Sequence, residues 1–111
     1  MTNAPPQGCV VLTTTSTVEE AEQLARVILK ENLAACATIL PGAKSIYLWQ
    51  GEIESAAEAL ILLKTVPEKL ADLEKRILAL HSYQTPEFLV LRVDSANANY
   101  LDWLCSSLKE R

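Results

Sequence analysis

The sequence has 111 residues, half of them apolar, and a formal net charge of −4 at neutral pH. This length is typical of a single domain that buries about two-thirds of its unfolded surface without disulfides or metals. The acidic balance gives no electrostatic reason to expect nucleic acid or an anionic membrane as a partner. No apolar run approaches the roughly 20 residues that span a bilayer.

Residues 1–8 are typical of a short flexible tail without a secretory signal, and we expect one domain over residues 9–111. The chain has three cysteines, Cys9, Cys36 and Cys105, which lie far apart and form no Cys-x-x-Cys pair. That pattern argues against a disulfide framework and against a zinc ribbon. We therefore expect a cytoplasmic protein whose thiols stay reduced.

The N-terminal part predicts a strand followed by a helix. Residues 9–15 are β-branched and apolar, which favours a buried strand. Thr17 and Glu20 then have the spacing of a capping box, with the Thr17 hydroxyl accepting from the Glu20 N–H and the Glu20 carboxylate reaching back. Apolar residues recur at helical spacing from 18 to 29, and Asn32 can end the helix in a left-handed conformation.

The middle of the chain predicts two long strands joined by a tight turn. Residues 34–49 form a strand interrupted once at Pro41-Gly42, where we expect a bulge or an edge. Gln50-Gly51 fits a hairpin turn, and residues 52–66 form the returning strand. At about 3.3 Å per residue the first of these strands extends on the order of 50 Å. The hairpin should therefore protrude beyond a small core.

The C-terminal part predicts a helix, a strand and a last helix. Pro67 fits the first position of the helix that ends near His81. Residues 81–87 are polar and form a loop, residues 88–93 form a strand, and Asn97 can cap the final helix. The whole order predicts an α+β fold, a ferredoxin-like βαββαβ sandwich with a long protruding hairpin and an extra C-terminal helix. The hairpin's exposed aromatics need cover, which a second copy of the chain would supply.

Five blocks of the sequence resemble, in order, the CutA divalent-cation-tolerance family. The similarity runs from about Cys9 to Leu108 and includes NLAACATILPG (32–42), SIYLWQG (45–51), LKT (63–65), HSYQTPE (81–87) and YLDWL (100–104). The resemblance implies a ferredoxin-like subunit in a tight homotrimer, related in architecture to the PII signalling proteins. It also implies a cytoplasmic role in tolerance to copper and other divalent metals.

His81 and Cys36 are the candidate metal ligands. His81 is the only histidine, and a neutral imidazole suits copper. Its alternative role is to cap the C-terminus of the second helix. Some members of the family have a Cys near Thr13 and paired His residues where this chain has Leu80-His81, so only His81 would remain of such a copper site. Cys36 could bind softer metals, or it could pack as a small apolar residue.

The resemblance also places a set of aromatic and charged residues near a cleft between subunits. Lys64 and Glu87 stand at strand ends, from which each could place a charge at the rim of such a cleft. The alternative is that the aromatics form interface core and that Lys64 and Glu87 form a structural ion pair. The set consists of Tyr47, Trp49, Lys64, Tyr83, Glu87 and Trp103.

The sequence contains no recognisable catalytic motif. It has no nucleophile elbow, no His-Glu-x-x-His and no glycine-rich phosphate loop, and it lacks the aromatic and basic strand of an RNA-binding domain. We therefore expect a protein that is not an enzyme and that does not bind nucleic acid or a membrane. Two functions stay open at this point: a trimeric metal-tolerance protein that binds copper, and a PII-like trimer that binds a small anionic ligand between subunits.

Overall fold

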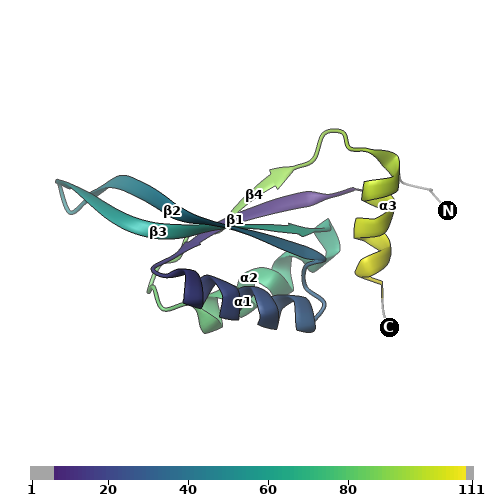
Figure 1. Ribbon diagram of the computed structural model, residues 1–111, viewed down its shortest axis with the longest axis horizontal. Helices are drawn as coiled ribbons and strands as arrows, with labels where there is room; N and C mark the ends of the chain where they lie inside the picture. Colours follow the sequence, from purple (N-terminus) through teal and green to yellow (C-terminus); the bar gives the residue numbers. More distant parts are fainter. Residues whose placement is uncertain (1–6, 110–111) are drawn as a thin grey trace.

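A four-stranded antiparallel sheet with the strand order β2-β3-β1-β4 organises the chain. The structure, a computed structural model, describes residues 7–109, so the first six residues of the predicted tail lie outside it. The elements are β1 (Cys9–Thr15), α1 (Val18–Lys30), β2 (Cys36–Trp49), β3 (Glu52–Thr65), the 3-10 turn η1 (Pro67–Lys69), α2 (Leu70–Leu80), β4 (Leu89–Arg92) and α3 (Ala98–Ser107). This arrangement, shown in Figure 1, confirms the predicted βαββαβ order and the added C-terminal helix.

Several predicted element ends are wrong by one to three residues. β2 begins at Cys36, two residues after the predicted start, since Ala34 is buried in the core before the ladder with β3 begins. Pro67 starts a 3-10 turn, and α2 begins only at Leu70. β4 is shorter than predicted because Phe88 packs against the core instead of joining the ladder. Gly8, assigned to the flexible tail, is buried, and its carbonyl accepts a hydrogen bond from the N–H of Val93.

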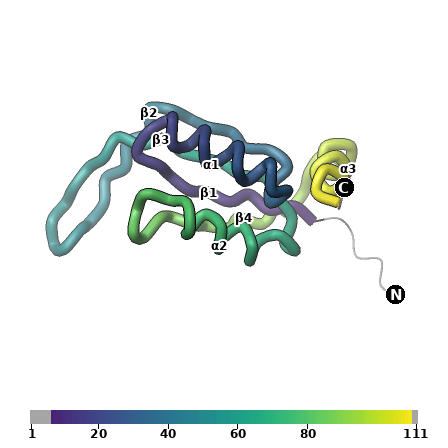
Figure 2. The backbone as a smooth tube through the Cα atoms, turned by 90° about the horizontal axis from the view of Figure 1, so that it is seen from below, coloured from purple at the N-terminus to yellow at the C-terminus, as the bar shows by residue number. Residues whose placement is uncertain are grey.

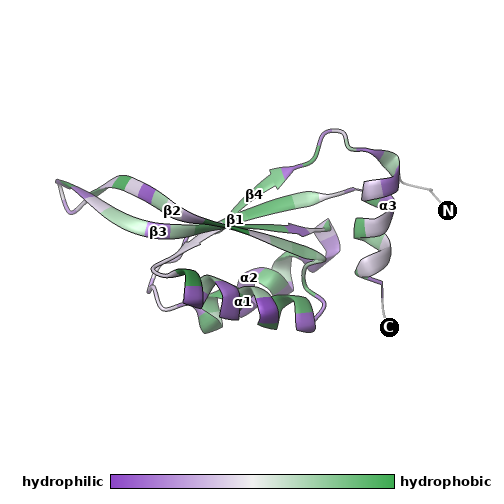
Figure 3. Ribbon diagram, in the orientation of Figure 1, coloured by the Kyte–Doolittle hydropathy of each residue, from purple (hydrophilic) through white to green (hydrophobic). Residues whose placement is uncertain are grey.

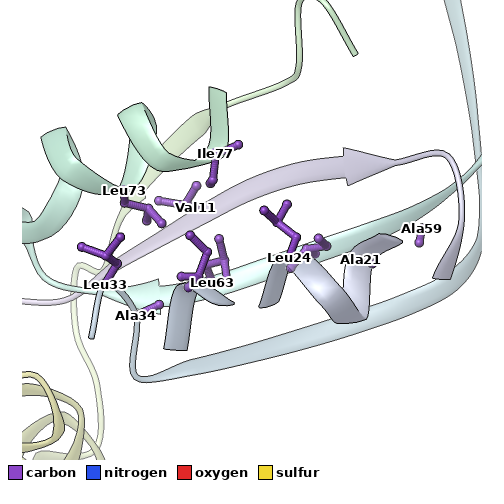
Figure 4. Packing of buried hydrophobic residues seen from close by; sticks show 11 residues of the cluster. Val11, Ala21, Leu24, Leu33, Ala34, Ala59, Leu63, Leu73 and Ile77 are labelled. Carbon is purple, nitrogen blue, oxygen red and sulfur yellow. The ribbon is translucent and has the colours of Figure 1, made fainter. Parts of the chain in front are cut away.

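The core lies between the sheet and the two helices α1 and α2, which cover the same face of the sheet (Figures 1 and 2). Every second residue of β1 is buried, as expected for a strand with one face against helices. Figure 4 shows how Val11 and Leu63 from the sheet meet Leu24 of α1 and Leu73 and Ile77 of α2. This packing fixes the direction of both helices relative to the strands.

The opposite face of the sheet is also largely apolar. Residues paired across neighbouring strands share a face, so the register of the strands identifies the residues that lie on the side away from the helices. We call it the open sheet face, and its apolar members are Val10, Leu12, Leu40, Leu60, Leu62, Leu89 and Leu91. Leu89 and Leu91 are each more than half exposed in the single chain. Within residues 7–109, no helix covers this face.

The β2–β3 hairpin extends well beyond the body, as predicted, and gives the molecule dimensions of 52 × 26 × 23 Å (Figure 1). Gln50 and Gly51 both have positive φ angles, 50° and 81°, which suit a two-residue hairpin turn. The register shifts between Leu40 and Ala43, where Gly42 has a φ of 77°, so Pro41-Gly42 forms the predicted bulge. Both hydrophilic and hydrophobic residues occur along the hairpin (Figure 3), and its exposed apolar side chains include Ile46, Leu48, Trp49 and Ile53.

Three threonines are buried on the helix-facing side of the sheet, and one of them has an unpaired hydroxyl. Thr15 donates to the carbonyl of Thr17 and Thr65 donates to that of Leu33, each at 2.8 Å. The hydroxyl of Thr13 has no hydrogen-bond partner within the described part of the chain. A buried hydroxyl without a partner destabilises the fold because it loses its hydrogen bonds to water.

We therefore expect Thr13→Val to raise the free energy of unfolding by about 1 kcal/mol. The matched variant Thr65→Val should lower it by a similar amount, because that hydroxyl does make a hydrogen bond. Urea denaturation of the three proteins at one protein concentration measures both changes. Equal destabilisation by the two substitutions would show that the Thr13 hydroxyl is satisfied after all.

Candidate functional site

A polar cluster surrounds the point where α2 ends and residues 81–87 turn back toward the sheet. We call it the loop cluster. It joins side chains from α1, β3 and the loop itself, and its titratable members are Glu20, Glu58, His81, Tyr83 and Glu87. The loop follows a helix packed on the core, so the scaffold beneath it is rigid.

His81 lies at the centre of the loop cluster with its side chain fully buried. Its Nδ1 accepts a hydrogen bond from the backbone N–H of Tyr83 at 3.0 Å. An accepting Nδ1 carries no proton, so Nε2 carries it and donates to the carbonyl of Thr14 at 2.7 Å. His81 is the C-cap residue of α2, as the structural alternative predicted, but its ring bonds to β1 and to the loop rather than to helix carbonyls.

Glu20 ties the start of α1 to the loop. The Thr17 hydroxyl accepts from the N–H of Glu20, which is the predicted first half of the capping box. The second half was predicted wrongly, because the Glu20 carboxylate turns to Ser82 and accepts from both its N–H and its hydroxyl at 3.0 and 2.9 Å. Partial burial opposes ionisation, but these bonds and one from Ser16 outweigh it and hold the pKa of Glu20 below its ordinary value.

Glu58 on β3 is held in a similar way from the other side of the loop. The hydroxyl of Tyr83 donates to its Oε2 at 2.8 Å. Although partial burial opposes ionisation, the hydroxyls of Ser45, Tyr83 and Thr14 together keep the pKa of Glu58 below its ordinary value. Burial and the bond to Glu58 in turn raise the pKa of Tyr83 far above the usual range, so the phenol keeps its proton.

Glu87 is the third carboxyl of the loop cluster and behaves differently. Burial, followed by the nearby charge of Glu58, raises its pKa above the ordinary value. This end of the sheet therefore has two carboxylates stabilised by donors and a third that resists ionisation. The cluster favours positively charged or hydrogen-donating groups over anions.

Lys64 and its neighbours lie at the other end of the open sheet face. The Lys64 Nζ donates to the hydroxyl of Thr38 at 2.6 Å and lies 3.7 Å from the sulfur of Cys36. Lys64 stands six positions after Glu58 on β3, which corresponds to about 20 Å. One copy of the chain therefore does not bring Lys64 together with Tyr83 and Glu87.

The remaining residues predicted to line the cleft lie on two further elements. Tyr47 and Trp49 belong to the hairpin, and Tyr47 is close enough to Tyr83 to influence its ionisation. Trp103 lies on α3, where its ring stacks at a tilt on Tyr100 with 5.6 Å between the centroids. Tyr47 thus joins the loop cluster within one chain, whereas Trp103 belongs to the C-terminal helix.

The described residues do not form a metal site in a single chain. Among residues 7–109, no three side chains of His, Cys, Asp or Glu are grouped so that they could hold a metal ion. Both ring nitrogens of His81 already have hydrogen-bond partners, so ligation would require one of these bonds to break. Cys36 is a free, partly exposed thiol beside Lys64.

Reasoning from the sequence missed most partners of the loop. Thr14, Ser16 and Glu58 belong to no distinctive motif, and the HSYQTPE block that contains Ser82 does not show which side chain Ser82 contacts. Their meeting depends on how the loop folds back across the ends of α1 and β1. A clue was present in Glu58, a charged residue that shares a face of β3 with the apolar Leu60 and Leu62.

Together these features define a class, namely ferredoxin-like α+β proteins with an extended hairpin, a C-terminal helix and a polar loop cluster beside an open sheet face. Residues 9–107 match the family model of the CutA1 divalent ion tolerance protein. The chain is 44% identical over 104 residues to the divalent-cation tolerance protein CutA of Citrobacter koseri, covering 94% of this chain and 90% of that protein. The chain therefore belongs to the CutA1 divalent ion tolerance family.

Solved structures agree with this assignment. CutA1 from Oryza sativa is 37% identical, and the match covers 95% of this chain and 96% of that one with a TM-score of 0.90. The periplasmic divalent cation tolerance protein CutA from Archaeoglobus fulgidus is 34% identical, with coverage of 92% and 99% and a TM-score of 0.88. The helices within residues 7–109 are all too short or too polar to cross a membrane.

The two donor-stabilised carboxylates predict how the stability of the fold depends on pH. Because the pKa values of Glu20 and Glu58 are lowered by folding, they stabilise the fold above their ordinary value of 4.5, and this contribution is lost as the pH falls through the folded values. Glu87 acts in the opposite direction, since its raised pKa favours folding at low pH and its contribution is lost as the pH rises. We expect the two carboxyls with lowered pKa values to dominate. The free energy of unfolding should therefore fall as the pH is lowered from about 5 to about 3.

Urea denaturation at a series of pH values measures this dependence. Glu58→Gln should flatten the profile in the acid range, because the substituted side chain no longer titrates. Glu74→Gln, which changes an exposed carboxylate on α2, is the matched control and should leave the slope as in the wild type. Identical profiles for wild type and Glu58→Gln would contradict the assignment.

Proposed function

We propose that the chain acts in tolerance to divalent metal ions as a cytoplasmic homotrimer. The observation that carries this proposal is the open sheet face together with the protruding hairpin. Monomeric proteins rarely expose a contiguous apolar surface of this kind, because its hydration is unfavourable. Membership of the CutA1 family supports the role in metal tolerance. The number of three subunits is what the resemblance described in the sequence analysis implies.

The occupant of the open sheet face that fits best is a second copy of the chain. The hairpin of one copy supplies Ile46, Leu48, Trp49 and Ile53, whose side chains are between 55% and 79% exposed. A hairpin that reaches beyond its own body can cover a neighbour's sheet. Because the hairpin and the face that it covers are different surfaces, such contacts are heterologous, and with a three-fold rotation between copies they close into a ring.

The charges at the two ends of the open sheet face are consistent with this ring. Lys64 stands at one end, and the carboxylates of the loop cluster stand at the other. In a head-to-tail arrangement the Lys64 end of one copy can approach the Glu87 end of the next. We propose this juxtaposition as the inter-subunit cleft, with Tyr47, Trp49, Tyr83 and Trp103 as its aromatic lining.

Copper is the metal that we propose as the ligand. Because residues 7–109 of one chain contain no group of three side chains that could hold a metal ion, we propose that the ligands come from more than one copy. Cys36 is the more accessible of the two predicted ligands, and a thiolate suits copper(I). His81 is the other candidate, although its contacts favour a structural role because both ring nitrogens are in use.

The alternative of a small anionic ligand between the subunits has less support. Three carboxyls belong to the loop cluster, and the cationic side chain of Lys64 lies at the far end of the same face.

A cytoplasmic location is supported by the cysteines, because Cys9, Cys36 and Cys105 are all free thiols. Fractionation of cells that express the chain tests the location directly.

The assembly can be tested by light scattering at micromolar concentration. We expect the mass of three chains for the wild type, and a mass that falls on dilution for Trp49→Ala, because the exposed indole would lose its partner surface. The dissociation concentration should rise by about tenfold or more. Glu74→Gln on α2 is the control and should assemble normally. A stable monomer at all concentrations would refute the trimer.

The metal can be tested by titrating the protein with copper(II), and with copper(I) under reducing conditions. We expect Cys36→Ser to weaken binding of copper(I), whereas Cys105→Ser, which removes a thiol on α3, should not. His81→Gln should mainly lower the melting temperature, because the ring joins β1 to the loop. If His81→Gln abolishes copper(II) binding without changing stability, His81 is a ligand and its structural role is refuted.

A further inference from the structure

The loop cluster reaches out of the body and contacts the base of the hairpin. The hairpin leaves the body just after the bulge, where Ala43 pairs with Glu58 and Ser45 pairs with Ala56. Ser45 and Glu58 are thus diagonal neighbours on the same face, and the Ser45 hydroxyl lies against the Glu58 carboxylate. The hydroxyl of Tyr83, from the loop, donates to the same carboxylate at 2.8 Å.

The backbone offers little that holds the hairpin at a fixed angle. Beyond the bulge the ladder joins only β2 to β3, since β1 ends opposite Ala59. Gly42, at the bulge, has open space around the position that a side chain would occupy. A two-stranded ribbon that leaves a sheet at a bulge can twist and bend about that point. Contacts from outside the ribbon are therefore needed to set its direction.

We propose that Ser45, Glu58 and Tyr83 form a latch that fixes the hairpin's base against residues 81–87, in the orientation in which the hairpin meets neighbouring copies. The remainder of the loop cluster anchors the latch to the body. The backbone N–H of Tyr83 bonds to His81, which bonds to β1, and the adjacent Ser82 bonds to Glu20 on α1. The proposal rests on the assembly described above. It makes Tyr83 a positioning residue for that assembly.

The latch couples the loop to the association of subunits. Releasing the Tyr83 hydroxyl should leave the core unchanged, since Val11, Leu63 and Leu73 do not depend on it. It should instead widen the range of hairpin orientations. Association would then have to fix a more mobile hairpin, and the larger loss of conformational entropy would weaken binding between copies. The expected result is weaker assembly with little change in the stability of the body.

The test compares Tyr83→Phe with Tyr100→Phe, which removes an equivalent hydroxyl from the exposed face of α3. Hydrogen exchange followed by mass spectrometry reports the hairpin amides (residues 43–58) separately from those of α1 and α2. Sedimentation reports the dissociation concentration. For Tyr83→Phe we expect exchange in the hairpin to be several times faster, exchange in the helices to be unchanged, and the dissociation concentration to rise by about tenfold. Tyr100→Phe should change neither the exchange nor the assembly.

A double-mutant cycle gives a second, independent readout. Tyr83→Phe and Glu58→Gln alter the two partners of one hydrogen bond, so their combined effect on hairpin exchange should be smaller than the sum of the separate effects. Additive effects would overturn the latch, as would faster exchange throughout the molecule or no change in the hairpin. If the wild type proves monomeric, the proposed assembly fails, and the exchange measurements alone still decide whether the latch exists.

Discussion

The constraint on which the rest of the structure depends is that two helices cover only one face of a sheet that is apolar on both. In β3 the run Ala59-Leu60-Ile61-Leu62-Leu63 places Ile61 and Leu63 in the core and Leu60 and Leu62 on the open sheet face. A strand that is solvated on one side would alternate apolar with polar residues, and this strand does not. The uncovered leucines are the reason for the assembly that we propose, and the long hairpin is consistent with it, since a short hairpin could not reach a neighbour's sheet.

The two ends of the open sheet face carry opposite charges. The carboxylates of the loop cluster are held by hydroxyl and amide donors at one end, and Lys64 bonds to Thr38 at the other. The donors matter because they outweigh the effect of burial and hold the pKa values of Glu20 and Glu58 below their ordinary values. In the head-to-tail contact that we propose, the carboxylates of one copy come near the Lys64 of the next. Charge complementarity of this kind selects one register of association over others.

The fold could largely be predicted from local patterns, and the site could not. The capping Thr17, the left-handed Asn32 and the turn at Gln50-Gly51 each act within a few residues, so the sequence shows them directly. The loop cluster joins residues as distant as Thr14 and His81, and no periodicity encodes that contact. The prediction that the Glu20 carboxylate completes the capping box was wrong for the same reason. A capping box satisfies a carboxylate locally, but Ser82 offered two donors from across the fold and displaced that arrangement.

The same contacts explain why the proposed metal site and the proposed assembly depend on each other. His81 is committed to β1 and to the loop, and the described residues offer no group of three ligands within one copy. A site shared between copies would form only when the copies associate, so the proposed metal binding and the proposed assembly would be thermodynamically linked. Because the loop cluster also contacts the hairpin's base through Tyr83, the residues that position the subunits lie beside the proposed cleft. In this proposal a change at the loop affects the ligand through the association of subunits, without any need for direct contact.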